Sequence, residues 1–502
     1  MDATTALTGL ILTPLVASPL VYLFGRLAAR AGAPRNPARW LALVVLAAAL
    51  AFLFPAGQAV LNGSAVEVVD GAIALRMDGI GLLLAAAVLV LGLLVTLFSS
   101  PYMAGEEGEE KFYALLVMMC GTMVGLGCAS DLFNLWIWFE AMAVSSYMLV
   151  AFYRQQGASL EAGVKYLVQS AAGSALVLLG IALVFSQSGT TSLAAIRAGA
   201  AAGSGPVLMA AGALFLIGFG VKTALVPMHT WLPDAHSQAP SGISAMLSGV
   251  VIEAGLVALL RAVGALAGVS TSWGLLLMVF GAMNILLGNL MALRQKQVKR
   301  MLAYSSLSHV GYMLIGLGVT VGFQLAQGAA GGFFHLLVHV LMKGLAFLAA
   351  GTLLYALHLA QGSHHPLVAD DLNGAARRYP FIALVFSLAL LSLGGLPPLA
   401  GFMSKWQIFV AGVQTHNMAV IVLVVFAALN SVLSLGYYAP LINRMYRKEI
   451  GPVVKMGKPV PAVMAVPLAL LALALVAVGF YPALFGWLVN PAAASLLVAF
   501  GG

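Results

Sequence analysis

The chain has 502 residues, of which 62% are hydrophobic and only 8% are charged. Soluble domains carry about 25% charged residues, so this composition excludes a soluble enzyme and predicts a polytopic membrane protein. The net charge of +8 could indicate a nucleic-acid partner, but the positions of the basic residues favour a topological signal instead.

Apolar runs long enough to cross a bilayer, about 20 residues each, follow one another along the chain. The first run lacks the basic region and cleavage site of a signal peptide, which favours a retained span. Between the second and third runs, residues 60–77 alternate apolar and polar side chains with Asn-Gly and Asp-Gly turns, which predicts a small extramembrane β-hairpin. The fourteen predicted spans are 5–24, 39–56, 78–99, 112–129, 132–152, 163–186, 206–235, 241–263, 272–292, 301–321, 327–358, 381–411, 418–442 and 460–489.

The basic residues divide unequally between the two ends of these spans. Only Arg76, Arg197 and Arg261 follow even-numbered spans. Since cytoplasmic loops carry an excess of Lys and Arg, we expect both termini to face away from the cytoplasm. The residues that follow odd-numbered spans are Arg26, Arg30, Arg35, Arg39, Lys111, Arg154, Lys165, Arg294, Lys296, Lys299, Arg300, Arg377, Arg378, Arg444, Arg447, Lys448, Lys455 and Lys458. The acidic stretch from Glu106 to Glu110 is interpreted as a solvated loop.

Titratable residues also lie inside the spans, where a charged side chain is expensive and therefore suggests a function. At about 1.5 Å per residue, Glu140, Glu253 and His309 lie about 14–18 Å deep. The Glu140 and Glu253 carboxyls could also be protonated and bonded to a neighbouring helix. His309 could equally be a hydrogen-bonded core histidine.

Three more titratable residues, His335, His339 and Lys343, are spaced four apart, so they line one face of one helix. His335 has the same structural alternative as His309, whereas His339 and Lys343 look more like a relay pair. Acids, lysines and histidines at one depth predict a polar path along the membrane that exchanges protons.

Lys222 and Lys405 lie in the two spans that are too long to be straight, and snorkelling to an interface is the alternative reading of both. Proline at position 227 and at 397–398 should break these spans. Asp234 and His236, near the cytoplasmic end of the first broken span, are either a proton inlet or simple helix caps.

Cofactor signatures are missing from the sequence: there is no CxxC motif, nucleotide loop or flavin signature, so we expect no cofactor and no metal. Cys120 and Cys128 share one apolar run, and two thiols alone do not make a metal site, so we expect core residues.

Several motifs resemble those of the proton-pumping, antiporter-like membrane subunits of respiratory complex I, Mrp-type sodium/proton antiporters and group 4 membrane-bound hydrogenases. The resemblance covers nearly the whole chain. It rests on DLFNLWIWFEAM, FGVKTALVPMHTWLPDAHSQAPSGISAMLSG, VKRMLAYSSLSHVGYMLIGLG, HLLVHVLMKGLAFLAAG and LPPLAGFMSKW.

The resemblance implies an all-α membrane protein of about fourteen helices, with two inverted five-helix repeats that each contain a broken helix. We expect one membrane domain over 1–502: N-terminal helices and hairpin (1–110), first half-channel repeat (111–264), second half-channel repeat (265–443) and a C-terminal segment with the last helix (444–502). The implied partners are other membrane subunits, including further antiporter-like subunits, in the cytoplasmic membrane of a prokaryote.

Carried over by motif, Glu140 resembles the acid of the first half-channel and Lys222 its paired lysine. His309, His335, His339 and Lys343 resemble the central relay, and Lys405 the terminal residue of the second half-channel. Many relatives have lysine where this chain has Glu253. An acid there could carry a proton or favour sodium, and it slightly favours the hydrogenase branch.

We therefore expect an ion-translocating subunit without a redox site of its own, belonging either to an oxidoreductase or to a cation/proton antiporter. Two other functions stay open. One is a haem protein with ligands from His309 and His335 or His339. The other is a stand-alone solute transporter with inverted repeats.

Overall fold

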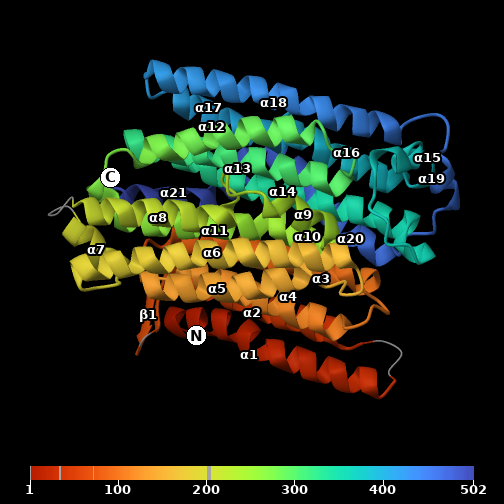
Figure 1. Ribbon diagram of the computed structural model, residues 1–502, viewed down its shortest axis with the longest axis horizontal. Coiled ribbons are helices and arrows are strands. Elements are labelled where there is room, and N and C mark those ends of the chain that lie inside the picture. Colours follow the sequence, from red (N-terminus) through yellow and green to blue (C-terminus); the bar gives the residue numbers. More distant parts are fainter. Residues whose placement is uncertain (1, 33–35, 72, 201–204, 502) are drawn as a thin grey trace.

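The computed structural model describes residues 2–32, 36–71, 73–200 and 205–501. Within these ranges the chain forms long helices that run side by side along the long axis of the view, with one two-stranded sheet (Figure 1). The strands β1 (Val66–Asp70) and β2 (Ile73–Met77) are antiparallel, with Val66 opposite Met77, so the predicted hairpin is present. The helices are α1 (Ala3–Arg30), α2 (Ala38–Leu61), α3 (Gly79–Tyr102), α4 (Glu109–Cys128), α5 (Leu132–Val150), α6 (Gly157–Ser188), α7 (Leu193–Ala200), α8 (Pro206–Thr223), α9 (Trp231–Gln238), α10 (Ser241–Met246), η1 (Leu247–Val251), α11 (Ile252–Ala265), η2 (Ala267–Val269), α12 (Trp273–Ala292), α13 (Val298–Phe323), α14 (Ala326–Leu357), η3 (Leu359–Gln361), η4 (Ala369–Leu372), α15 (Ala375–Arg378), α16 (Pro380–Gly394), α17 (Ala400–Val413), α18 (Met418–Met445), α19 (Pro452–Met456), α20 (Ala462–Phe480), η5 (Pro482–Phe485) and α21 (Gly486–Ala499).

Fourteen helical segments among the described residues are long and apolar enough to cross a membrane, which confirms the polytopic architecture. These fourteen segments differ from the fourteen predicted spans in two places. The predicted span 381–411 consists of α16 and α17, which have 15 and 14 residues and are separately too short to count. The predicted last span, 460–489, is wrong in extent: Pro482 cannot donate the next helical hydrogen bond, so α20 stops and α21 continues to Ala499.

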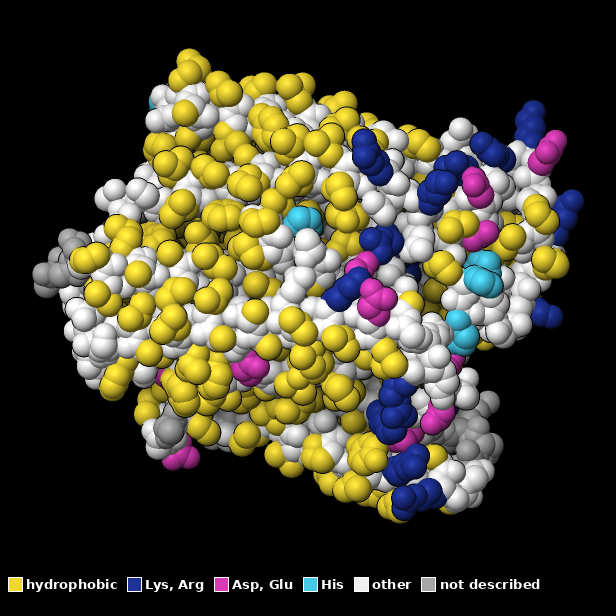
Figure 2. Space-filling view, in the orientation of Figure 1, with side chains coloured by type: hydrophobic (Ala, Val, Ile, Leu, Met, Phe, Trp, Pro, Cys, Tyr) yellow, Lys and Arg dark blue, Asp and Glu magenta, His cyan; other side chains and the backbone are white. Residues whose placement is uncertain are grey.

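Charge separates the two ends of the molecule. Lys and Arg side chains gather at the right of the view in Figure 2, and hydrophobic side chains cover most of the remaining surface. We call the right end, where α15 and α19 lie, the basic end, and the opposite end, with the hairpin, α7 and the C-terminus, the distal end (Figure 1). Both chain termini lie in the distal half of this view.

The solvated loop that the sequence suggested for Glu106 to Glu110 is only half correct: Glu107 is exposed in the loop before α4, whereas the two acids that begin α4 are not. Glu109 and Glu110 are buried, at 5% and 2% exposure. They lie 3.2 Å from Arg39 and 3.5 Å from Arg26, respectively, so they join α4 to the first two helices at the basic end.

Two spans, α10–α11 and α14, are buried by protein over most of their length. Helix α14 packs against α3, α10, α13, α16, α17, α20 and α21, which come from every part of the chain. Polar side chains on these two spans therefore face protein rather than lipid, where neighbouring helices can provide hydrogen-bond partners.

Helix α13 lies unusually close to α12, because glycines let the two backbones touch. A Cβ added to Gly281 would come within 2.8 Å of the Gly311 carbonyl, and one on Gly288 within 2.7 Å of the Ser308 amide. Small residues of this kind are typical of close helix contacts in membranes. The contact fixes the height of His309, which directly follows Ser308.

Both predicted breaks are present. Helix α8 ends at Thr223, Ala224 adopts a left-handed conformation with φ of 57°, and α9 begins seven residues further on, at Trp231. Helix α16 ends at Gly394, Gly395 has φ of 79°, and α17 begins at Ala400. Pro227 and the pair at 397–398 lie within these breaks, as expected.

Candidate functional site

Lys222 lies in the last turn of α8 and is completely buried. Its Nζ donates hydrogen bonds to Tyr166 Oη at 2.7 Å and to Ser146 Oγ at 3.3 Å. Tyr166 in turn stacks on Trp231 across the break, with ring centroids 3.9 Å apart. The Trp231 indole donates to the Val221 carbonyl at 2.7 Å, so the lysine and the break are held together.

The expected pairing of Glu140 with Lys222 is not a direct contact. Among the described residues the two side chains form no direct ion pair; the Lys222 amine donates instead to the hydroxyls of Tyr166 and Ser146. Glu140 on α5 is partly buried, and its Oε1 has no hydrogen-bond partner among the described residues. A change of rotamer or a water molecule would be needed to join the two groups.

Glu253 and His339 form a buried couple between α11 and α14. Glu253 Oε1 lies 2.8 Å from His339 Nδ1, and both side chains are 0% exposed. The remaining polar atoms, Glu253 Oε2 and His339 Nε2, have no partner among the described residues. The π-helical turn η1 directly precedes Ile252 and thereby sets the direction of Glu253; such turns are frequent at functional sites.

A second couple lies beside it, between α13 and α14. His309 Nδ1 is 3.0 Å from His335 Nε2, and His335 Nδ1 is 2.8 Å from Ser404 Oγ on α17. The His309 ring centroid is 5.3 Å from that of His339. The three histidines and Glu253 thus form one cluster at the centre of the bundle.

The two remaining lysines bond to hydroxyls and carbonyls rather than to acids. Lys343 Nζ donates to the Leu302 carbonyl at 2.8 Å and to Ser305 Oγ at 2.5 Å. Lys405 Nζ donates to the Leu393 carbonyl at 2.9 Å and to Ser431 Oγ at 2.8 Å. Leu393 lies in the last turn of α16, so Lys405 binds a carbonyl freed by the second break.

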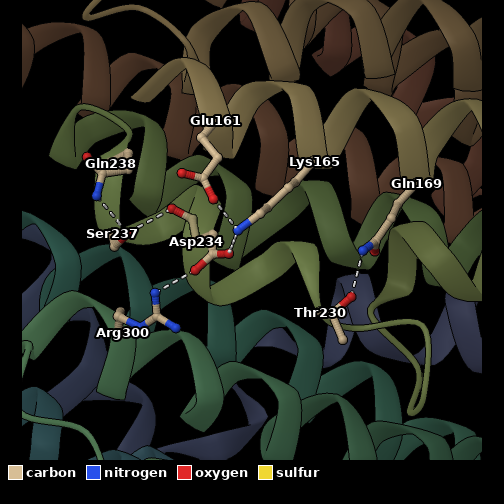
Figure 3. Close-up of polar contacts among 8 residues, drawn as sticks. All are labelled: Glu161, Lys165, Gln169, Thr230, Asp234, Ser237, Gln238 and Arg300. Carbon is tan, nitrogen blue, oxygen red and sulfur yellow. Dashed lines mark hydrogen bonds and ion pairs between the residues drawn. The ribbon is translucent and has the colours of Figure 1, made fainter. Parts of the chain in front are cut away.

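Asp234 and His236 point to different places. Asp234, 25% exposed, pairs with Lys165 at 3.1 Å and Arg300 at 2.5 Å, and Figure 3 shows its carboxylate between them. Thr230, not Asp234, is the N-cap residue of α9, so Asp234 is no helix cap. His236 is completely buried and stacks on Phe347 at 4.8 Å, and neither ring nitrogen has a partner among the described residues.

Sequence reasoning missed the hydroxyl and amide partners of the charged groups. Asn284 on α12 is one: its Oδ1 accepts from the Val226 amide at 2.8 Å, and its Nδ2 donates to the Ala224 carbonyl at 3.2 Å and to the Leu307 carbonyl at 3.4 Å. This side chain ties the first break to α13. An Asn inside an apolar run was the available signal, because a buried amide needs partners.

Known proteins are similar to this chain over most of its length. Residues 129–431 match the family described as "NADH:quinone oxidoreductase/Mrp antiporter, TM", and residues 66–113 match "NADH-Ubiquinone oxidoreductase (complex I), chain 5 N-terminus". F(420)H(2) dehydrogenase subunit N of Methanosarcina mazei is 33% identical over 78% of this chain and 78% of its own length.

Two further relatives come from other complexes. Hydrogenase-4 component B of Escherichia coli is 35% identical over 66% of this chain, which spans 50% of that protein. A chain in the structure of the membrane-bound sulfane sulfur reductase, an archaeal respiratory membrane complex, has a TM-score of 0.85 and 28% identity, with 98% of both chains covered.

Proposed function

The chain belongs to the NADH:quinone oxidoreductase/Mrp antiporter family of membrane subunits, and from this premise we propose that it translocates protons as one subunit of a multisubunit complex. The observation that carries the proposal is the buried Glu253–His339 couple beside the His309–His335 couple. Buried ionisable groups are costly in a membrane protein and mark ion pathways when they line up.

The Glu253–His339 couple can pass a proton between the two halves of the chain. With His339 Nδ1 bonded to the carboxyl, a proton that moves from Glu253 to Nδ1 makes an imidazolium. Loss of the proton on Nε2 then restores a neutral ring in its other tautomer. Because His339 Nε2 has no partner among the described residues, the proton it releases needs a water molecule as acceptor. The net result is one proton moved from Glu253 across the His339 ring.

The second half continues with groups that are already in contact. His309 and His335 share a hydrogen bond, and His335 bonds to Ser404, the residue before Lys405. Lys343 lies one helical turn, about 6 Å, beyond His339 on α14. A charged Lys343 would oppose an imidazolium at His339, so its protonation state can decide when the proton moves on.

Lys222 and Glu140 supply the first half-channel in this proposal. The Lys222 amine is held by two hydroxyls and not by a direct ion pair with Glu140. Approach of the Glu140 carboxylate would stabilise the ammonium form, and separation would favour release of a proton.

For the inlet at the basic end, the observations favour His236 over Asp234. A small cavity of about 50 Å³ at the basic end is lined by Ser237 and Gln238, which directly follow His236, and by Lys299; His236 itself does not line it. His236 stacks on Phe347, which follows Lys343 by one turn on α14. Asp234 is already neutralised by two cations, and we assign it to holding α9 in place.

The chain is a multi-pass membrane protein. We further propose that it lies in the cytoplasmic membrane of a prokaryote with the basic end inside and both termini outside, following the rule that basic loops stay in the cytoplasm. Its partners are other membrane subunits, including further antiporter-like subunits, and redox chemistry belongs to the partners. The two inverted repeats with limits 111–264 and 265–443 remain a prediction, as does sodium as the alternative ion.

Proton pumping by the purified complex in liposomes tests the proposal directly. Lys222→Met should abolish acidification inside the vesicles while the subunit still assembles, because methionine keeps the bulk but cannot hold a proton. The matched control is Lys448→Met, since Lys448 is exposed at the basic end and outside the proposed path. Undiminished pumping by the Lys222 variant would overturn the proposal, and pumping that depends on sodium would favour the alternative ion.

A further inference from the structure

A cavity of about 860 Å³ opens at the distal end, between the hairpin, α7, α11 and α21. We call it the distal cavity. One water molecule needs only about 15 Å³ of such space, so the distal cavity has room for many. Its wall contains charges of both signs, including Glu67 and Arg76 on the hairpin, which lie 3.2 Å apart.

The floor of the distal cavity is an ion pair between Asp78 and Arg261. Asp78 Oδ1 and Oδ2 accept from the Arg261 guanidinium at 2.9 and 3.2 Å, and Arg261 also donates to the Gly127 carbonyl. The Arg261 side chain is only 9% exposed. Asp131, the N-cap residue of α5, lines the same cavity and accepts from the Phe133 amide at 2.9 Å.

Two residues that line the distal cavity lie on the same helices as the acids of the first half-channel. Arg261 follows Glu253 by eight residues on α11, and Asp131 precedes Glu140 by nine along α5. At about 1.5 Å per residue these separations are about 12 and 14 Å, less than half of a bilayer core of about 30 Å. Both acids keep one oxygen, Glu253 Oε2 and Glu140 Oε1, that has no partner among the described residues.

We propose that the distal cavity is a water-filled vestibule that exchanges protons between the distal side and the first-half acids Glu140 and Glu253. This inference rests on the proposed proton translocation and adds an outlet on the first repeat. Ionised side chains on the wall favour water over lipid tails, because a charge in hydrocarbon is costly. The Asp78–Arg261 pair separates the vestibule from Glu253, and its opening would admit water to α11.

Accessibility of single cysteines in the full complex tests the inference. Ala194 and Ala494 are exposed and line the distal cavity from α7 and α21. The reagent is a membrane-impermeant cationic methanethiosulfonate, added outside two vesicle preparations of opposite orientation. Ala194→Cys and Ala494→Cys should react only in the preparation whose distal side faces outward. The native Cys120 and Cys128 are buried, so this subunit should not react before a cysteine is introduced; labelling is therefore read on the separated subunit.

The functional readout is the pumping rate after labelling. A trimethylammonium label in the vestibule should slow pumping about fivefold, since a cation near the path opposes a proton by about 1 kcal/mol. The matched control is Thr271→Cys, which is exposed in the loop after α11 and does not line the distal cavity; its labelling should leave pumping unchanged.

Two results would overturn the vestibule. Labelling of both alanine positions only after detergent extraction would mean that lipid or a partner subunit fills the cavity. Labelling in membranes without slower pumping would place the cavity off the path. If Lys222→Met abolishes pumping in the same preparation, either result contradicts the vestibule but not proton translocation by this subunit. If the complex does not pump protons, both proposals are wrong.

Discussion

The carboxylate of Glu253 lies 2.8 Å from His339 Nδ1, with both side chains completely buried. This is a direct polar contact between α11 and α14, which are buried over most of their length. Glu253 therefore joins the first half of the chain to the histidines of the second. Whether its carboxyl binds a proton or a sodium ion determines which ion can be transferred between the halves.

Replacing Glu253 by glutamine distinguishes the hydrogen-bonding role of this side chain from its role in carrying a proton. Glu253→Gln keeps the size and a hydrogen bond to His339, but an amide does not titrate. We expect assembly to be normal and pumping to be lost, as measured by the number of protons moved per electron. Glu253→Lys tests the departure from lysine-bearing relatives: unchanged sodium dependence and proton stoichiometry would contradict the bridging role.

Tyr166 is expected to position the amine of Lys222. Tyr166→Phe removes the hydroxyl 2.7 Å from Nζ but keeps the ring that stacks on Trp231. Loss of a hydrogen bond to a charged group is worth about 1.5–3 kcal/mol, so we expect pumping to fall about tenfold or more. Rate against pH in liposomes should shift as well. Tyr446→Phe, at a position 49% exposed, serves as the control.

Asn284 is expected to stabilise the first break. Asn284→Ala leaves the buried Val226 amide without its acceptor, which costs about 1–3 kcal/mol. The thermal midpoint for loss of this subunit from the complex should fall accordingly. Asn284→Asp keeps an acceptor for that amide but loses the donor to Ala224 and Leu307, so it should lie between wild type and alanine. Equal midpoints in all three proteins would show that the break is held by other contacts.

The stability of the turn η4, which contains Asp371, should depend on pH. Burial alone would raise the pKa of Asp371, but hydrogen bonds from His358 and the Val368 amide outweigh it and hold the pKa below its usual value. A lowered pKa stabilises the turn above the unfolded value of about 3.9 and loses that effect as the pH falls through the folded value. Hydrogen exchange at Val368, corrected for intrinsic rates, should therefore be slow at neutral pH and rise only below about pH 4. Asp371→Asn should abolish this pH dependence.

Much of the fold followed from the sequence because length and hydropathy decide which segments span a membrane. The hairpin, the first eleven spans and both breaks lie where apolar runs, Asp-Gly and proline predicted them. The last span was harder: 460–489 contains Pro482, and the apolar run continues beyond it, so composition alone does not show where α20 ends and α21 begins.

The candidate site was predictable in its members but not in its contacts. Depth along a helix placed Glu253, His309 and His339 at similar heights, and they are indeed neighbours. Which partner a buried amine takes depends on helix rotation and on small side chains. Lys222 bonds to Tyr166 instead of Glu140 for that reason, and no spacing rule reports it. The burial of Glu109 likewise depends on Arg39, from a helix distant in sequence.

Helix α14 runs for 32 residues without a break and contains His335, His339 and Lys343 at fixed intervals. A continuous helix keeps the backbone positions of these residues at fixed spacing, so proton transfer among them requires rotamer changes or water. Side-chain rotations take picoseconds to nanoseconds in exposed residues, whereas shifts of whole helices take microseconds to milliseconds. The turnover rate is therefore expected to be limited by movements of the two broken helices, α8–α9 and α16–α17. Helix α14 is expected to stay in place while they move.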